Sequence, residues 1–280
     1  MGRYKIPITK QKLIRLYIDK KLTPQKIGEL LGCSFATVRN RMKEFGITFR
    51  RPSIARQRFD KKDFSGDPVE EAYLIGFRVG DLNVYVPNLQ TSNTLVARCH
   101  TTDIPQVKLM KAIFSQYGAV RVSKSIHGYS INCYLNRSFD FLLPKKRPER
   151  IDGEMKVVAA FVAGYVDAEG NFIVNQGRGR FKLDSYDVDV LFWMDNWLKR
   201  QNIKSLFRQI ARKGDTQYIR GKLGYFHENL WRINVNEAKS LKRFIGFILP
   251  YLKHSRRIQQ AKQMLANIEA RIRYGSVKDS

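Results

Sequence analysis

Two acidic residues, Asp81 and Glu169, occupy the same position in two short segments of similar pattern, LIGFRVGDL (residues 74–82) and VAGYVDAEG (residues 162–170). Each segment is largely apolar, so each acid is predicted to lie at the end of a buried helix. A helix C-terminus already carries partial negative charge, which makes a carboxylate there unfavourable unless a cation compensates it. Two such carboxylates side by side would suit divalent metal ions, which prefer oxygen ligands and promote phosphodiester hydrolysis.

Small residues in the two segments indicate how the acids could be brought together. Gly76 corresponds to Gly164, and Gly80 corresponds to Ala168. A glycine within a helix costs about 1 kcal/mol relative to alanine, so it is expected where a second backbone must approach closely. We therefore expect the two helices to pack side by side, with their C-terminal ends and the two acids adjacent.

The charge of the chain favours a polyanionic partner. Its 280 residues include 51 Lys and Arg but only 25 Asp and Glu, a formal net charge of +26. This excess favours nucleic acid, with a ribosome-like or membrane-surface role as the alternative. Hydrophobic residues make up 43% of the chain, which allows a sizeable core and excludes global disorder.

Three scattered cysteines without a CxxC pair argue against a zinc ribbon or a disulfide framework. We therefore expect a reducing compartment, either the cytoplasm or an organellar matrix. The chain shows neither an apolar signal core at its start nor an apolar run of membrane-spanning length, so no membrane partner is expected.

Residues 1–48 are predicted to form a small DNA-binding module. Thr23-Pro24 and Gly32 bound a helix in LTPQKIGELLG (residues 22–32), and a second helix follows in SFATVRNRMKEFG (residues 34–46). This pattern resembles a three-helix helix-turn-helix module with its recognition helix at residues 34–45. The side chains of that helix expected to contact DNA are Thr37, Arg39, Asn40, Arg41 and Lys43. The alternative is a helical cap with a solvated basic face.

Residues 49–66 are expected to be a basic linker in which Arg50 and Arg51 follow the phosphate backbone. The rest of the chain repeats one pattern, helix, two strands, helix, two strands and helix, over residues 67–150 and 151–280. A basic helix at residues 255–274 is expected to pack outside the second copy. The pattern predicts an α+β fold with two pseudo-symmetric halves, preceded by the small all-α module.

Alternation of polar and apolar residues in the predicted strands gives each half one polar sheet face. The side chains expected to contact bases or phosphates from these strands are Arg121, Arg180, Lys182, Arg208, Gln209 and Arg212. A solvated sheet face is the alternative for each of them.

The segment VAGYVDAEG closely resembles the signature of the LAGLIDADG homing endonuclease family, with Glu169 in place of the last Asp. LIGFRVGDL is more divergent but keeps Gly76 and Asp81. The resemblance covers about residues 67–262 and implies a monomer of two αββαββα halves, each presenting a saddle-shaped, four-stranded sheet to DNA. The two motif helices would form the seam between the halves.

The resemblance also implies roles for individual residues. Asp81 and Glu169 would be the metal ligands and the catalytic acids, assisted by the backbone carbonyls of Gly80 and Ala168. By the same resemblance Asp167 would brace the seam rather than bind the metal, and the first copy, with Val79 at the corresponding position, does without it.

A basic residue often supports the metal site in this family. The segment LPYLKHSRR (residues 249–257) lies where that residue is expected, which makes Lys253 and Arg256 the candidates. In another register Ser255 takes the lysine position, so the identity of the supporting residue stays open.

These features together predict a site-specific double-stranded DNA endonuclease that uses Mg²⁺ or another divalent cation. Family members of this type cut both strands of a long duplex site across the minor groove and leave 3′ overhangs. Two alternatives remain open: a non-catalytic DNA-binding transcription regulator on the same fold, and an intron RNA maturase.

Overall fold

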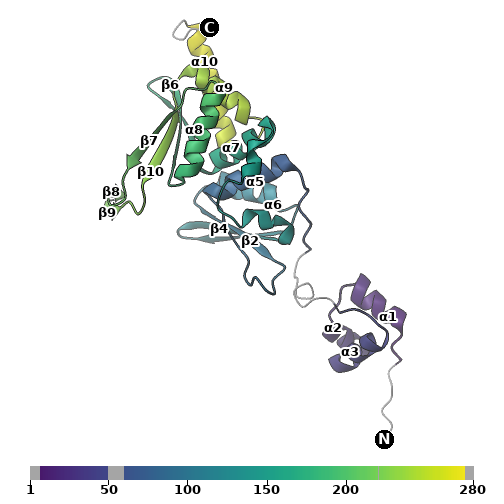
Figure 1. Cartoon of the computed structure of the whole chain (residues 1–280). Helices are drawn as coiled ribbons and strands as arrows, with labels where there is room; N and C mark the ends of the chain where they lie inside the picture. Colours follow the sequence, from purple (N-terminus) through teal and green to yellow (C-terminus); the bar gives the residue numbers. More distant parts are fainter. Residues whose placement is uncertain (1–6, 50–59, 220, 275–280) are drawn as a thin grey trace. The chain divides into compact units, whose positions relative to one another are not determined.

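The structure is a computed structural model that describes residues 7–49, 60–219 and 221–274. It divides into two compact units (Figure 1). The small unit falls within two segments, residues 1–59 and residues 88–93. The larger unit falls within residues 60–87 and 94–280.

The small unit is built from short helices: α1 (Lys10–Ile14), the π-helical turn η1 (Arg15–Asp19), α2 (Pro24–Leu31) and α3 (Phe35–Glu44). Thr23 and Ser34 cap α2 and α3, accepting hydrogen bonds from the amides of Lys26 and Thr37 at 3.2 and 3.1 Å. Gly32 ends α2 at φ +66°, a left-handed conformation that glycine adopts without strain. The two helices predicted at residues 22–32 and 34–46 are therefore present.

A single apolar cluster holds these helices together. Its fully buried members are Leu13, Tyr17, Ile27, Val38 and Met42. They recur at helical spacing, so each helix turns one apolar face inward and leaves its basic residues outside.

The larger unit contains two similar halves. The first comprises α5 (Pro68–Gly80), β1 (Asn83–Tyr85), β2 (Leu95–Thr101), α6 (Ile104–Phe114), β3 (Ala119–Ser125), β4 (Gly128–Leu135) and the 3₁₀ helix η2 (Arg137–Leu142). The second comprises η3 (Glu149–Asp152), α7 (Met155–Glu169), β5 (Gly170–Asn175), β6 (Arg178–Ser185), α8 (Val188–Arg200), β7 (Leu206–Ala211), β8 (Thr216–Ile219), β9 (Lys222–Tyr225), β10 (Leu230–Val235), α9 (Ala238–Ile248) and α10 (Ser255–Arg273).

The two main sheets have equivalent topologies, which confirms the predicted α+β fold of two pseudo-symmetric halves. Each has four antiparallel strands, in the orders β1-β2-β4-β3 and β5-β6-β10-β7. Helices cover one face of each sheet, and α5 and α7 run side by side between the halves (Figure 1). A continuous apolar core extends through both halves.

Two features of the larger unit were not predicted from the sequence. The strand β1 spans only Asn83–Tyr85, and its few residues give no clear alternation. The strands β8 and β9 form a separate two-stranded sheet between β7 and β10, with no equivalent among the described strands of the first half.

The larger unit begins at residue 60, within the predicted linker 49–66. The ring of Phe64 packs against Tyr117, Phe139 and Phe141, with ring centroids 4.9–6.2 Å apart. The amide of Lys62 also donates to the Tyr117 carbonyl at 2.9 Å. Residues 60–66 thus belong to the first half, because an aromatic side chain and a backbone hydrogen bond attach them to it.

The helix α10 contributes to the core, although it was predicted to pack outside. It buries Ala261, Met264 and Ile268 against the second half and also contacts α6. His254, the residue before it, donates its amide to Asp167 of α7. Of the helices that the structure describes, none combines the length and the apolar character needed to cross a membrane.

Candidate metal and nucleic-acid site

The seam between α5 and α7 depends on glycine. A Cβ atom on Gly76 would lie 2.0 Å from the Phe161 carbonyl oxygen, and one on Gly164 would lie 2.1 Å from the Tyr73 carbonyl oxygen. A Cβ on Gly80 would lie 2.4 Å from the Cβ of Ala168. No side chain fits at these points, so the predicted close approach of the two helix backbones is confirmed.

The seam brings Asp81 and Glu169 to neighbouring helix ends. Asp81 is the C-cap of α5, and Glu169 is the last residue of α7. Burial raises the pKa of Asp81 to about 6, and the charges of Arg257 and Lys145 oppose this rise. Burial and then the charge of Asp81 raise the pKa of Glu169 to about 7. The two carboxylates therefore repel each other in a partly desolvated site.

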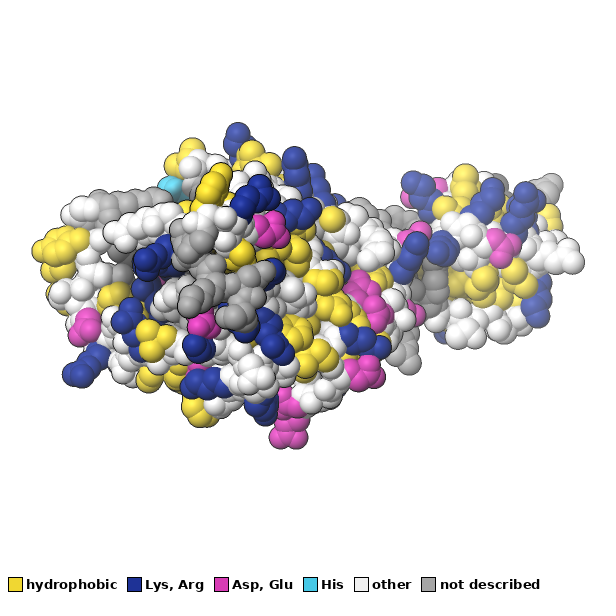
Figure 2. Space-filling view, turned by 90° about the horizontal axis from the view of Figure 1, so that it is seen from above, with side chains coloured by type: hydrophobic (Ala, Val, Ile, Leu, Met, Phe, Trp, Pro, Cys, Tyr) yellow, Lys and Arg dark blue, Asp and Glu magenta, His cyan; other side chains and the backbone are white. Residues whose placement is uncertain are grey.

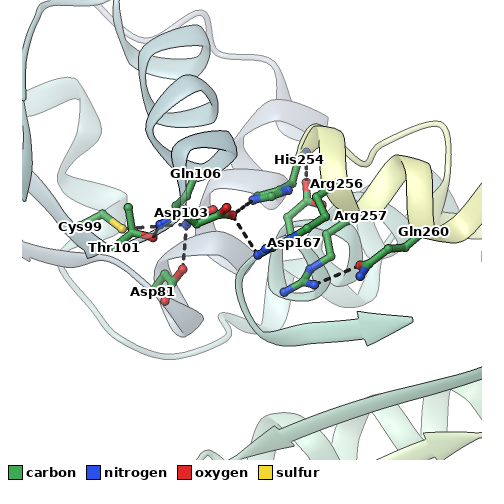
Figure 3. Close-up of polar contacts among 10 residues, drawn as sticks. All are labelled: Asp81, Cys99, Thr101, Asp103, Gln106, Asp167, His254, Arg256, Arg257 and Gln260. Atoms are coloured by element: carbon green, nitrogen blue, oxygen red, sulfur yellow. Dashed lines mark hydrogen bonds and ion pairs between the residues drawn. The ribbon is translucent and has the colours of Figure 1, made fainter. Parts of the chain in front are cut away.

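Gln106 of α6 fixes the orientation of the Asp81 carboxylate. Its Nε2 donates a hydrogen bond of 2.7 Å to Asp81 Oδ2, and Gln106 itself is 4% exposed (Figure 3). Cys99 lies against the same amide, and burial raises the pKa of its thiol to about 12, so this thiol stays protonated.

Asp167 lies on α7 just before the site and joins three segments. Its Oδ2 accepts hydrogen bonds from the Tyr73 hydroxyl at 2.7 Å and from the amides of Lys253 and His254 at 2.7 and 3.0 Å. Burial raises its pKa to about 6, and these hydrogen bonds oppose the rise. With its oxygen occupied in this way, Asp167 braces the seam, as the family resemblance implied.

The structure places the predicted Lys253 and Arg256 near the acids and adds two further cations. The Lys253 ammonium lies over the Tyr73 ring, 4.6 Å from its centroid, and Arg256 pairs with Asp103 at 2.9 Å (Figure 3). Arg256 also lines a cavity together with Glu169. The cations whose charges lower the pKa values of both acids are Arg257 and Lys145.

Arg257 is half-buried at the N-terminus of α10. Its Nη1 donates to Gln260 at 3.1 Å, and burial lowers the pKa of its guanidinium while Asp167, Asp103 and Asp81 raise it. Arg257 was not predicted because the sequence alone does not show which of the adjacent Arg256 and Arg257 faces the acids. Lys145 was missed because it belongs to a segment whose prolines and charges indicate a linker.

The site suits a divalent cation. It offers two carboxylates in a partly desolvated position, beside helix ends whose last carbonyls have no intrahelical partners. Gly80 and Ala168 lie in those last turns, next to the acids. In the described part of the chain, no three or more His, Cys, Asp and Glu side chains form a group that could hold a metal. The remaining ligands would therefore come from backbone, water or substrate oxygens.

Two open cavities of about 480 and 490 Å³ are both lined by Glu169. Lys182 and Arg257 line the first, and Lys145 lines the second. Glu169 is thus accessible to a large substrate, with cations lining the cavities on either side of it.

The polar face of the first sheet carries a row of residues that crosses all four strands. Asn83, Arg98, Asn132 and Arg121 lie opposite one another in β1, β2, β4 and β3. The Arg98 Nε donates to Asn132 Oδ1 at 2.8 Å, while Arg121 is exposed at the edge. Arg121 therefore lies on the polar face, where it was predicted to contact DNA.

The second sheet has a comparable row. Asp184, Arg232 and Arg208 lie opposite one another in β6, β10 and β7, and Arg232 forms a bidentate pair with Asp184 at 2.5 and 2.6 Å. Arg180 and Lys182 are half-buried on the same face of β6.

One predicted contact on the second sheet needs correction. Gln209 follows Arg208 directly in β7, and neighbouring residues of a strand point to opposite faces. Gln209 lies opposite Trp231, whose ring stacks on Phe207 of the helix-covered face. Its amide donates to the Ala211 carbonyl at 3.2 Å, so Gln209 does not share the face of Arg208. Arg212 is exposed just beyond the end of β7.

In the small unit, the predicted recognition helix exposes most of the expected residues. Thr37, Arg39, Asn40 and Lys43 are exposed, while Arg41 is half-buried and pairs with Glu44 at 2.6 Å. Arg50 and Arg51 lie outside the described residues.

Arg39 lies beside two aromatic rings, with its guanidinium carbon 5.5 Å from the Phe35 centroid and 5.3 Å from that of Phe49. Lys and Arg side chains are also spread over the face of the larger unit seen in Figure 2.

Comparisons with known proteins agree with this geometry. Residues 156–248 match the family model described as a LAGLIDADG-like domain. An uncharacterized protein of Methanocaldococcus jannaschii, MJ0398, is 23% identical over 188 residues, a region that spans 65% of this chain and 66% of that protein.

Two solved structures are also similar. The crystal structure of I-DmoI in complex with DNA and Ca has a TM-score of 0.51 and 13% identity, over 70% of this chain and 98% of that one. Full-length DUF199/WhiA from Thermatoga maritima has a TM-score of 0.44 and 13% identity, over 73% of this chain and 62% of that one.

Proposed function

We propose that the protein is a site-specific double-stranded DNA endonuclease that acts with a divalent cation, since residues 156–248 match the model of a LAGLIDADG-like domain. The observation that carries this proposal is the pair Asp81 and Glu169, brought together at the ends of α5 and α7 by a glycine-dependent seam. Both acids belong to one chain, so a monomer supplies the whole site. The similar protein I-DmoI was crystallised with DNA and Ca, which supports the same class of substrate.

Asp81 and Glu169 would hold Mg²⁺ or a related cation, with the Gly80 and Ala168 carbonyls beside them. When bound, the cation would stabilise the charge that develops on the phosphate during hydrolysis. Among the protein groups, Gln106 keeps the Asp81 carboxylate in one orientation. Arg257 and Lys145 offset the negative charge of the two acids in the protein that holds no cation.

The two polar sheet faces would bind the duplex on either side of the acids. Cations on these faces bind phosphates and so position the DNA, whereas bidentate contacts to base edges give specificity. The side chains that we assign to this interface are Arg121, Arg180, Lys182, Arg208 and Arg212. The small unit would add contacts through the exposed residues of α3, namely Thr37, Arg39, Asn40 and Lys43.

A cleavage assay tests this proposal. The purified chain is incubated with a random duplex library and Mg²⁺, and the ends of the cut products are sequenced. We expect a defined site with staggered ends. Asp81→Asn and Glu169→Gln should bind the recovered site as the wild type does but should not cut it. Glu154→Gln is the matched control, because Glu154 caps the opposite end of α7 and is exposed.

A second candidate is a DNA-binding regulator without cleavage, and the separate small unit with its exposed basic helix favours it. This candidate predicts that a defined duplex is recovered by binding, with the same affinity in Mg²⁺ and in EDTA, and that no condition yields cut ends. Adding the corresponding RNA duplex as competitor tests the RNA alternative in the same assay.

A further inference from the structure

The strand pair β8–β9 distinguishes the second half from the first. β7 and β10 are separated by residues 212–229, which contain β8 and β9, whereas β3 and β4 are joined through residues 126–127 alone. Figure 1 shows β8 and β9 projecting beyond the ends of β7 and β10. The second half therefore carries an extension that its counterpart lacks.

Hydrogen bonds hold the two sides of this extension together at its base. The Gly214 amide donates to the Phe226 carbonyl at 2.8 Å, and the Phe226 amide donates to the Asp215 carbonyl at 3.0 Å. The Lys213 amide also donates to the Asn229 side chain at 2.9 Å. These bonds join the two strands where they leave β7 and β10, so we define residues 213–226 as the β8–β9 ribbon.

One face of the β8–β9 ribbon is aromatic and exposed. Tyr218 lies opposite Leu223, and Thr216 lies opposite Tyr225, so these four side chains share a face. Tyr218 is 77% exposed, Tyr225 is 56% exposed and Leu223 is 50% exposed. Large apolar side chains are stabilised by burial, so such a face suits a surface that becomes covered on binding.

The charge around the ribbon favours an anionic partner. Residues 206–230 contain five Lys and Arg (Arg208, Arg212, Lys213, Arg220 and Lys222) and two Asp and Glu (Asp215 and Glu228). The Asp215 carboxylate accepts the amide of Arg212 at 2.7 Å, so one of the two acids is bonded to the base of the ribbon. A second copy of this chain is disfavoured as the partner, because each copy has a net charge of +26.

Duplex DNA fits both properties of the ribbon. The major groove of B-DNA admits a two-stranded β-ribbon, and tyrosine rings make apolar and hydrogen-bond contacts with base edges and sugars. The β8–β9 ribbon connects β7, which carries Arg208, to β10, which carries Arg232, and it projects beyond the ends of both strands (Figure 1).

We propose that the β8–β9 ribbon binds duplex DNA beyond the part contacted by the main sheets, so that the second half covers a longer stretch of the target than the first. This inference rests on the proposed binding of double-stranded DNA but does not require cleavage. Tyr218 and Tyr225 provide the apolar contact, and Lys213 provides a phosphate contact.

Binding to shortened duplexes tests this assignment. Target duplexes are selected from a random library by binding in EDTA, shortened stepwise from either end, and titrated with the full chain. The wild type should lose affinity after fewer base pairs are removed from one end of the duplex, the end bound by the ribbon, than from the other end. Tyr218→Ser combined with Tyr225→Ser should bind the full-length target about tenfold more weakly and should no longer respond to shortening of that end.

Ile126→Ser is the matched control, because Ile126 is 95% exposed in the turn that occupies the corresponding place in the first half. It should bind like wild type at every length. Leu223→Ser is a second ribbon variant and should show a smaller loss at the same end. Thermal melting of each variant confirms that the fold is retained.

Each result has one meaning. If shortening each end lowers the affinity of the tyrosine variant as much as it lowers that of the wild type, the inference is overturned and the proposed function is untouched. If wild type self-associates through the ribbon and the variant does not, the ribbon binds protein and the inference is also overturned. If the end dependence holds but no duplex is ever cut, only the endonuclease proposal fails. If no duplex is bound at all, both fail.

Discussion

The hydroxyl of Tyr73 on α5 donates a hydrogen bond of 2.7 Å to the buried carboxylate of Asp167 on α7. The same oxygen accepts the amides of Lys253 and His254, so it also holds the start of α10 against the seam. Asp167 thereby connects the two halves and positions α10, the helix that carries Arg257 toward the acids.

Removing this carboxylate should destabilise the larger unit. Asp167→Ala would leave one hydroxyl and two amides without their acceptor, and we expect the free energy of unfolding to fall by about 3–5 kcal/mol. Tyr73→Phe removes only one of the three bonds and should cost about 1–2 kcal/mol. Urea unfolding of both variants measures the difference. Equal losses in the two variants would contradict the role of Asp167 as a shared acceptor.

A second prediction concerns the close packing of α5 and α7 at Gly164. In Gly164→Ala the new methyl group would lie 2.1 Å from the Tyr73 carbonyl oxygen, so α5 and α7 would have to separate. We expect a loss of about 3 kcal/mol or more in unfolding free energy, together with loss of cleavage, because overpacking also displaces the acids.

Gly246→Ala provides a matched control in α9. A Cβ atom there would meet no atom within 4 Å, and alanine favours a helix by about 1 kcal/mol over glycine, so this variant should be slightly more stable than wild type. If Gly164→Ala unfolds at the same urea concentration as Gly246→Ala, the seam does not depend on glycine.

The parts of the site that could be predicted are those with a local signal. Gly76 and Gly164 are unusual inside apolar helices, and each precedes an acid by five residues, so comparing the two segments revealed both the seam and the acids. The alternation of Phe181 and Leu183 with basic residues likewise predicted the orientation of β6.

The parts that could not be predicted depend on tertiary contacts. Gln106 reaches Asp81 from a helix that begins 23 residues later in the chain, and no spacing rule connects the two. Arg257 reaches the acids only because Asp167 fixes the start of α10. Gln209 was misassigned because Arg and Gln were selected by residue type, whereas strand geometry places consecutive residues on opposite faces.

The raised pKa values of the acids predict how stability depends on pH. In the folded protein the pKa is about 7 for Glu169 and about 6 for Asp81, whereas unfolded Glu and Asp have values of about 4.3 and 3.9. Between about pH 4 and pH 7 the folded state therefore binds more protons than the unfolded state, and the free energy of unfolding falls as the pH rises.

The size of this effect follows from about 1.4 kcal/mol per pKa unit. Between pH 5 and about pH 7, roughly two units, ionising Glu169 should cost roughly 2–3 kcal/mol. Asp81 should contribute less, because part of its side chain stays in contact with solvent, which screens the carboxylate. Denaturant unfolding in EDTA at pH 5 and pH 8 measures the decline. The double variant Asp81→Asn, Glu169→Gln should lose most of it, and added Mg²⁺ should reverse it in wild type alone. A decline of equal size in both proteins would assign it to other groups.

The two halves share a local structure at the start of the helix that follows their second strand. The hydroxyl of Thr101 accepts the amide of Asp103 at 3.0 Å, and that of Ser185 accepts the amide of Asp187 at 3.1 Å. The helices α6 and α8 begin one residue after these aspartates, so their residues can be compared position by position.

At the third position of these helices the halves differ. Gln106 of α6 donates to Asp81, whereas Val190 of α8 has an apolar side chain and cannot donate to Glu169. If the protein cleaves DNA as proposed, Gln106→Leu should slow scission of one strand by about 10- to 100-fold, the usual effect of losing a group that orients a metal ligand. Val190→Leu changes the volume of the side chain without removing an amide, so both DNA strands should be cut at the wild-type rate. A plasmid carrying the selected site measures this, since a nicked circle should accumulate before the linear product in Gln106→Leu. Equal slowing of both strands would show that Gln106 acts on the whole site rather than on the Asp81 side alone.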